Sequence, residues 1–94
     1  MNNGEHIEYY SDGEIRYRCN YLGVNRHGEF INYYISGEIS SKCNYLGDNR
    51  HGESTFYGRS GDILTIWYYI DGKSITELEW LSYNRNLKLE FLGL

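Results

Sequence analysis

Hydrophobic and polar residues alternate along several stretches of the chain, and glycines separate these stretches. Along Ile15–Leu22 the residues fall into two alternating sets. The first set consists of Ile15, Tyr17, Cys19 and Tyr21, and the second, more polar set consists of Arg16, Arg18, Asn20 and Leu22. This period of two predicts a strand with one buried face. The preceding stretch Glu5–Ser11 has the same character. It is followed by Asp12-Gly13, a strong hairpin-turn signal, and we expect the second strand to run over Glu14–Leu22.

The same layout recurs with a period of 24 residues. Residues 4–27 and 28–51 are identical at sixteen positions, and residues 52–75 match the second unit at seven. The outermost unit of a repeat array diverges because one of its sides has no neighbour. The sequence therefore predicts one all-β domain of three β-hairpin repeats, with residues 76–94 as a C-terminal capping segment.

The segment after the repeats carries two competing signals. Ser74 and Glu77 have the spacing of a capping box, and apolar residues follow at helical spacing, which predicts a short helix over about Ile75–Tyr83. Farther on, the alternation in Leu87–Phe91 predicts a strand. A single helix that starts at Ser74 and continues through both stretches is the alternative. In either form we expect the segment to cover the open end of the sheet.

Composition and charge narrow the range of partners. The chain has 11 tyrosines, 11 glycines and no proline, a usage that fits short strands joined by tight turns. Lys and Arg total 9 against 13 Asp and Glu, so the net charge is −4. We therefore expect no direct nucleic-acid partner and no membrane partner, since both favour a basic surface. There is no long apolar run or signal-peptide character, and we expect a cytoplasmic protein.

Two recurring pairs suggest chemistry but are better explained by structure. Arg26-His27 and Arg50-His51 lie in corresponding loops, without a nucleophile or acid at an interpretable spacing. Cys19 and Cys43 lack the closely spaced ligand pair of a zinc site, and two strands would separate them by about 9–10 Å, too far for a disulfide. Trp67 takes the same place in the third unit, which indicates a buried apolar position. We expect no catalytic residues, no metal site and no cofactor.

The recurring motif resembles a known family. Each unit opens with Gly-Glu. The turns of the first two hairpins share the pattern Tyr-Tyr-x-x-Gly-Glu-Ile, and successive units are joined by Asn-Tyr-Leu-Gly-x-Asn-Arg-His-Gly-Glu. Together they resemble the MORN repeat, in the variant found in bacterial antitoxin components and in phage and giant-virus proteins. The resemblance covers residues 4 to about 75. It implies that the three hairpins stack in a single elongated, meandering, twisted antiparallel sheet. Such a sheet is expected to serve as a binding or scaffolding surface, in the cytoplasm of a bacterial cell or virus-infected host cell.

The tyrosines are the candidate binding residues. We expect Tyr9, Tyr33 and Tyr57 to stack on one face of the sheet. Tyr10 and Tyr34 are expected to stack on the other face, where exposed rings make good anchors for a partner. The resemblance suggests a non-catalytic module that acts as a small acidic inhibitor or antitoxin and occludes a toxin or defence-system nuclease. The expected binding residues combine two outward tyrosines with polar neighbours: Tyr10, Tyr34, Glu8, Asn32, Arg16, Arg18 and Lys42.

Other functions remain open at this stage. Unpaired edge strands near Met1–Tyr10 would allow self-assembly as a scaffold, so the chain is expected to be a monomer or a homodimer joined through edge strands. Stacked tyrosines also suit single-stranded nucleic acid, and lipid binding is attributed to this repeat class. The lack of any basic segment counts against the last two.

Overall fold

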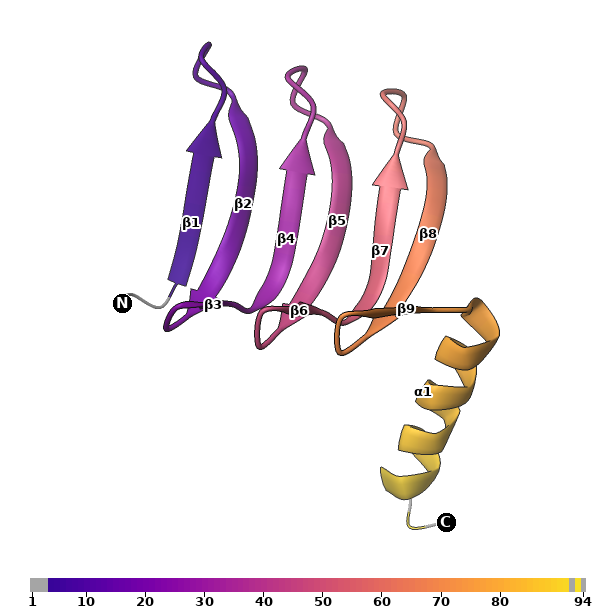
Figure 1. Ribbon diagram of the computed structural model, residues 1–94. Coiled ribbons are helices and arrows are strands. Elements are labelled where there is room, and N and C mark those ends of the chain that lie inside the picture. The colour runs from indigo at the N-terminus through magenta and orange to yellow at the C-terminus, as the bar shows by residue number, and fades with distance from the viewer. Residues whose placement is uncertain (1–3, 92, 94) are drawn as a thin grey trace.

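The computed structural model, which describes residues 4–91 and 93, confirms three antiparallel hairpins in one open sheet (Figure 1). Neighbouring strands follow the order β1-β2-β4-β5-β7-β8-β9, while β3 pairs with β2 and β6 pairs with β5. The elements are β1 (Gly4–Tyr9), β2 (Ile15–Leu22), β3 (Asn25–Arg26), β4 (Gly28–Tyr33), β5 (Ile39–Leu46), β6 (Asn49–Arg50), β7 (Gly52–Tyr57), β8 (Ile63–Ile70), β9 (Lys73–Ile75) and α1 (Glu77–Phe91).

Each hairpin turns through a loop that is wider than the sequence suggests. In the first, the backbone N–H of Tyr10 donates to the Glu14 carbonyl (2.7 Å) and the N–H of Gly13 donates to the Tyr10 carbonyl (3.0 Å). Gly13 has φ = 93°, a conformation that glycine adopts at little cost, and this explains why a glycine ends every such loop. The first strand accordingly ends at Tyr9 rather than at Ser11.

Two-residue strands lie within the segments expected to be loops. β3 folds back on the end of β2, so that Tyr21 pairs with Arg26, and β6 does the same against β5. Because β3 occupies the end of β2, the next hairpin pairs with β2 over two positions only, Tyr17 with Asn32 and Arg18 with Ile31. The direct strand pairing between repeats is therefore short.

Hydrogen bonds at both ends of the strands supplement this short pairing. Near the turns, the Tyr10 hydroxyl donates to the Tyr33 carbonyl of the next hairpin (2.6 Å), and the Tyr34 hydroxyl donates to the Tyr57 carbonyl (2.5 Å). We call these two contacts the tyrosine clamps. Both tyrosines are half-buried. The third repeat has Gly58 at the corresponding position, where no further hairpin follows to accept a bond.

At the opposite end, each loop bonds to the loop before it. The N–H of Asp48 donates to the Arg26 carbonyl (3.1 Å), and the N–H of Gly72 donates to the Arg50 carbonyl (2.9 Å). The Asp48 carboxylate also accepts from the Arg26 guanidinium at 3.1 Å. That hydrogen bond is the main reason why the pKa of Asp48 lies below its usual value.

Asp48→Asn should therefore lower the melting temperature modestly at neutral pH. A depressed carboxyl pKa stabilises the folded state above the unfolded pKa of about 3.9, and this contribution disappears as the pH falls through the lower folded value. Asparagine tolerates the φ of 74° at this position, so only the charge changes. Melting curves of the wild type and the variant should converge on acidification. Asp71→Asn, at a similar φ of 50° and without an ion pair in the described structure, is the matched control.

The C-terminal segment differs from the two-element prediction. β9 is the third copy of the short strand and pairs with Tyr68–Ile70, so Ser74 is in a strand and does not cap the helix. Thr76 caps it instead: its hydroxyl accepts from the Glu79 N–H (3.1 Å), and the Glu79 carboxylate accepts from the Thr76 N–H (2.9 Å). The expected strand over Leu87–Phe91 is wrong, because one helix continues to Phe91.

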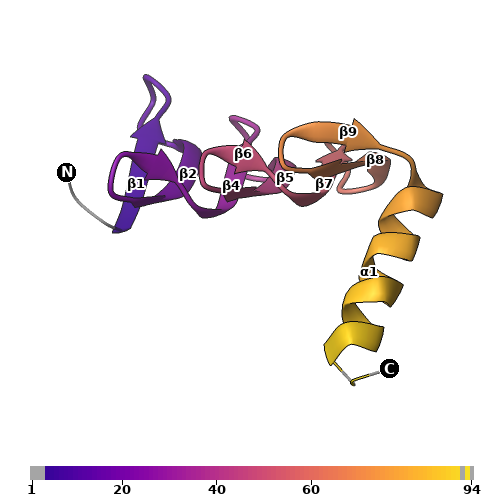
Figure 2. The same ribbon diagram turned by 60° about the horizontal axis from the view of Figure 1, so that its bottom comes forward.

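The helix leaves the sheet rather than covering it. Figures 1 and 2 show α1 projecting from the end of the sheet that β8 and β9 form. The described hydrogen bonds and ring contacts between α1 and the sheet involve only Glu77, Trp80 and Tyr83. The outer side of β8 is thus paired at Tyr68–Ile70, while Ile63–Trp67 has no strand beside it in the described structure. The expected capping of the open end of the sheet is therefore confined to the part beside Tyr68–Ile70.

Candidate functional site

The strand register places most aromatic rings on one side of the sheet, which we call the aromatic face. Directly paired residues share a face, so His6 lies beside Cys19, and Phe30 beside Cys43. Tyr17 and Phe30 stack across the first repeat junction with their ring centroids 5.2 Å apart. Further contacts extend this row to both sides: Tyr21 with His6, His6 with Tyr17, and Phe30 with Tyr45.

The tyrosine stacks expected from the sequence are absent from the described ring contacts. Tyr9, Tyr33 and Tyr57 stack neither with one another nor with other rings, and the same holds for Tyr10 and Tyr34. Equivalent residues of successive repeats lie two strands apart, about 9–10 Å, whereas ring pairs need centroids within about 7 Å. Within the sheet, the described aromatic contacts instead join residues of adjacent strands.

Two arginines from the short strands β3 and β6 lie over rings of this face. The Arg26 guanidinium is 4.7 Å from the centroid of Tyr45, and that of Arg50 is 5.5 Å from the centroid of Tyr69. Arg26 is neutralised by Asp48, but the position equivalent to Asp48 in the third repeat is Gly72. Arg50 consequently pairs with no carboxylate in the described part of the chain, and its guanidinium donates to the Tyr69 hydroxyl at 3.4 Å.

The aromatic face is most exposed at its C-terminal end. Trp67 is 49% exposed and Phe56 37% exposed, and together with Thr65 and Tyr69 they line an open hollow. We call these four residues, with Arg50 at the rim, the terminal aromatic surface. The expectation of a buried position at Trp67 is wrong. Cys19, its counterpart in the first repeat, is only 2% exposed, because a following hairpin packs beside β2 but not beside β8.

Four of the predicted binding residues lie together near the turns. Tyr10, Arg16, Asn32 and Tyr34 line a hollow of about 380 Å³, whose lining also includes Phe56 of the terminal aromatic surface. The two tyrosines are not free anchors, since their hydroxyls form the clamps between repeats. Asn32 donates to the Ser41 hydroxyl (3.0 Å), which leaves Arg16 as the most exposed of the four.

Of the other predicted residues, Glu8 adjoins the hollow through Arg16, whereas Arg18 and Lys42 lie on another face. Glu8 accepts from His6 at 2.6 Å and lies 4.0 Å from Arg16. Strand alternation places Arg18 and Lys42 on the face opposite the aromatic one, where Arg18 pairs with Glu5 at 3.6 Å. The seven residues therefore do not form one surface.

The described structure shows the state of the two thiols and the placement of the side chains that could bind a metal. Both cysteines are free, and burial raises the pKa of Cys19 and of Cys43, which makes each thiol less reactive. Among residues 4–91 and 93, no three His, Cys, Asp or Glu side chains gather as a metal site would require. No described helix is long and apolar enough to cross a membrane.

Comparison with known proteins identifies the repeat. A family model described as the MORN repeat variant matches residues 2–22 and 26–46, which include both strands of each of the first two hairpins. The third hairpin and the helix lie outside the matched stretches. No curated protein and no solved structure matches the chain.

Proposed function

Because this chain is a MORN-type repeat protein, we propose that it is a non-catalytic module that binds a partner protein through the terminal aromatic surface. The carrying observation is the half-exposed Trp67 beside Phe56, on the repeat that departs most from its neighbours. Exposed apolar groups that gather on one surface mark protein interaction sites, and Trp, Tyr and Arg dominate their binding energy. Trp67, Tyr69 and Arg50 supply all three.

The surface has the layout of an interaction site. Phe56 and Trp67 provide an apolar centre, while the Arg50 guanidinium at the rim is available to a carboxylate or carbonyl of the partner. Since Arg50 has no described carboxylate of its own, pairing with the partner breaks no existing ion pair.

More specifically, we propose that this binding module is an inhibitor of the antitoxin type. A net charge of −4 on a small domain would steer it toward a protein with a basic surface, such as a toxin or a nuclease. Binding there would exclude that protein's own nucleic-acid substrate. This specificity is supported by charge and size, and the resemblance to antitoxin components supports it in addition.

The test is affinity capture from the native host, with and without nuclease treatment, comparing the wild type with Trp67→Ala. We expect one stoichiometric protein that survives nuclease and whose affinity falls roughly thirtyfold in the variant, as for a residue worth about 2 kcal/mol. Leu46→Ala is the matched control, because Leu46 is equally exposed on another strand.

Three results would count against the proposal. Loss of the captured protein on nuclease treatment would favour nucleic-acid binding. Equal capture by Trp67→Ala would place the binding site elsewhere on the sheet. If the captured protein is an enzyme whose activity is unchanged in the complex, the inhibitor proposal fails while partner binding stands.

A further inference from the structure

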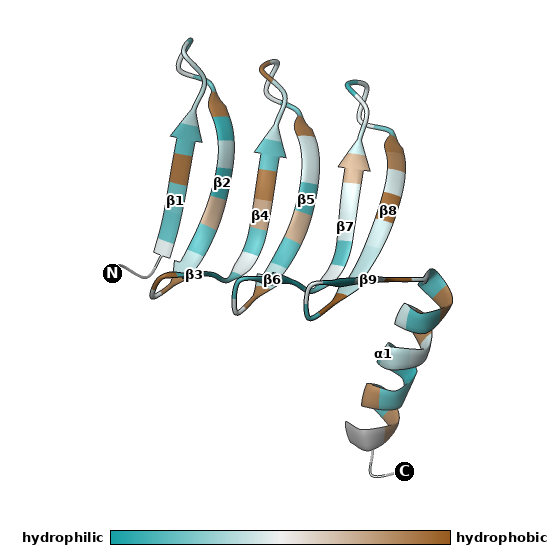
Figure 3. Ribbon diagram, viewed as in Figure 1, coloured by the Kyte–Doolittle hydropathy of each residue, from teal (hydrophilic) through white to brown (hydrophobic). Residues whose placement is uncertain are grey.

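The outermost strand of the third hairpin is the least polar strand of the sheet. β8 reads Ile-Leu-Thr-Ile-Trp-Tyr-Tyr-Ile and carries no charge. The equivalent strands β2 and β5 lie inside the sheet yet carry Arg16, Arg18 and Lys42. In β8 the positions of those charges hold Leu64 and Ile66. Figure 3 shows the resulting apolar bands along β8.

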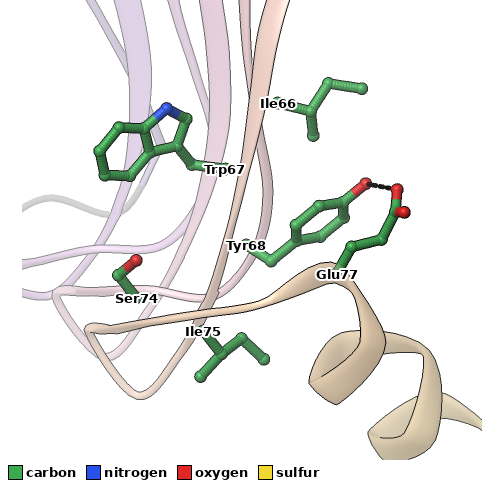
Figure 4. A pocket seen from close by; sticks show the side chains of 6 residues that line it. All are labelled: Ile66, Trp67, Tyr68, Ser74, Ile75 and Glu77. Atoms are coloured by element: carbon green, nitrogen blue, oxygen red, sulfur yellow. Dashed lines mark hydrogen bonds between the residues drawn. The ribbon is translucent and has the colours of Figure 1, made fainter.

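This apolar strand is also an open edge. Ile63 is 58% exposed and Leu64 is 69% exposed, and the Ile63–Trp67 segment has no neighbouring strand on its outer side in the described structure. A hollow of about 460 Å³ follows the lower part of the edge, between β8, β9 and the start of α1 (Figure 4). Figure 4 also shows that Trp67 points to one side of β8, and Ile66 and Tyr68 to the other.

Sheet edges are normally protected by charge against pairing with other chains. The opposite edge of this sheet follows that rule, because β1 carries Glu5, His6 and Glu8. β8 does the reverse, since charges present in its interior counterparts are replaced by Leu and Ile. An edge that is both unpaired and uncharged is suited to pairing with another strand.

We propose that the β8 edge pairs with β8 of a second copy, antiparallel, about a two-fold axis near Thr65. Centred there, Ile63 faces Trp67 of the other copy and Leu64 faces Ile66, so every flanking pair is apolar. The segment is uncharged, so two copies of net charge −4 meet where neither places a carboxylate. Such a two-fold contact uses the same edge of both copies, so the assembly stops at two chains.

The alternative of adding β1 of a second copy fits less well. Continuing the register of the internal junctions would place Glu8 opposite Thr65, bringing a carboxylate to the apolar edge. Gly58 provides no tyrosine clamp for a following hairpin, and Thr76 occupies the place where a further repeat would begin. The chain has thus lost the features that join one repeat to the next.

The two-fold pairing has a consequence for the proposed binding surface. An axis that relates antiparallel strands of one sheet is perpendicular to that sheet, so both aromatic faces lie on the same side. The two terminal aromatic surfaces would then flank the axis and present a double site. The pairing itself does not depend on the proposed function, since it involves only the edge of β8.

The first test is the mass in solution by size exclusion with light scattering. We expect twice the 11.1 kDa of one chain for the wild type and a single chain for Leu64→Arg/Ile66→Lys. These substitutions install the residues found at the same positions of β2 and β5, so the strand should form and the melting temperature of the monomer should stay measurable. A monomeric wild type, or a dimer that survives both charges, would overturn the proposal.

Cross-linking then tests the geometry. Antiparallel partners have Cα atoms about 4.5–5.5 Å apart, within reach of a disulfide, so Thr65→Cys should form a covalent dimer under copper–phenanthroline oxidation. The wild type controls for the two native thiols. If a disulfide forms only when Thr65→Cys is mixed with Glu8→Cys, the contact is head-to-tail and the two-fold dimer is wrong. No partner protein is present in either assay, so failure here leaves the proposed function untouched.

Discussion

Replacing Tyr10 and Tyr34 together by phenylalanine is expected to lower the free energy of unfolding by about 2 kcal/mol, since each change removes one hydrogen bond between repeats. The direct strand pairing at each junction covers only two positions, so the clamps are a large share of what holds the repeats together. A domain of this size has a total stability of roughly 5–15 kcal/mol. Urea unfolding followed by tyrosine fluorescence measures the change.

The neighbouring tyrosine provides the control. Tyr9 is 58% exposed and its hydroxyl has no described partner, so Tyr9→Phe should leave the unfolding midpoint unchanged. An unfolding midpoint of the double variant equal to that of the wild type would show that the clamps contribute nothing. Alanine at both clamp positions should cost more, because the half-buried rings are lost as well. Loss of binding in the double alanine variant would therefore not locate a binding site at Tyr10 and Tyr34.

The repeat register and the hairpin layout were predictable because they depend on local signals. Glycine at a fixed place in every turn and the alternation along β2 both follow from the conformation of a single strand and its turn. The 24-residue identity then propagates one hairpin to the next. Stacking as a single sheet followed from the resemblance to MORN repeats rather than from periodicity.

The clamps and the short strands were not predictable in the same way. A hydroxyl of Tyr10 that reaches a carbonyl 23 residues later leaves no mark on local periodicity, and its repetition at Tyr34 fits a binding row equally well. β3 has only two residues, too few for an alternating pattern. At the C-terminus two overlapping capping boxes compete, and strand pairing of Ser74 decides in favour of Thr76.

One residue of the candidate surface stands out in the sequence, although its position by itself favours the opposite conclusion. Trp67 stands at a position otherwise held by cysteine, which predicts burial. A larger side chain in the last repeat equally indicates that the packing constraint of a following hairpin is absent. The third repeat also has Gly58 where the earlier repeats have tyrosine, and Leu64 and Ile66 where charged residues occur in the earlier repeats. These departures fit the absence of a following hairpin as well. In a repeat array, departures confined to the outermost unit are therefore the place to look for an interaction surface.

Replacing Trp80 by alanine is expected to release the helix from the sheet. Its ring stacks on Tyr68 and Tyr83, with centroids 6.2 and 5.8 Å away, and meets His51 edge-on at 6.2 Å. Losing these contacts should cost about 2 kcal/mol, less than for a fully buried tryptophan because the ring is half-buried. An isolated helix of 15 residues is marginal in water, so α1 needs this anchor to remain formed.

Backbone amide exchange distinguishes release of the helix from general unfolding. In Trp80→Ala, amides of residues 81–89 should lose protection, whereas those of β4 and β5 should keep it, because no described ring contact or hydrogen bond joins α1 to these two strands. Leu78→Ala is the matched control: Leu78 lies on the same helix, is 77% exposed and should leave exchange unchanged. Protection that persists along α1 in Trp80→Ala would mean that the helix is stable without the sheet. In that case its position relative to the sheet would be set by the β9 strand, the Tyr68–Glu77 hydrogen bond and the Tyr83–His51 ring contact.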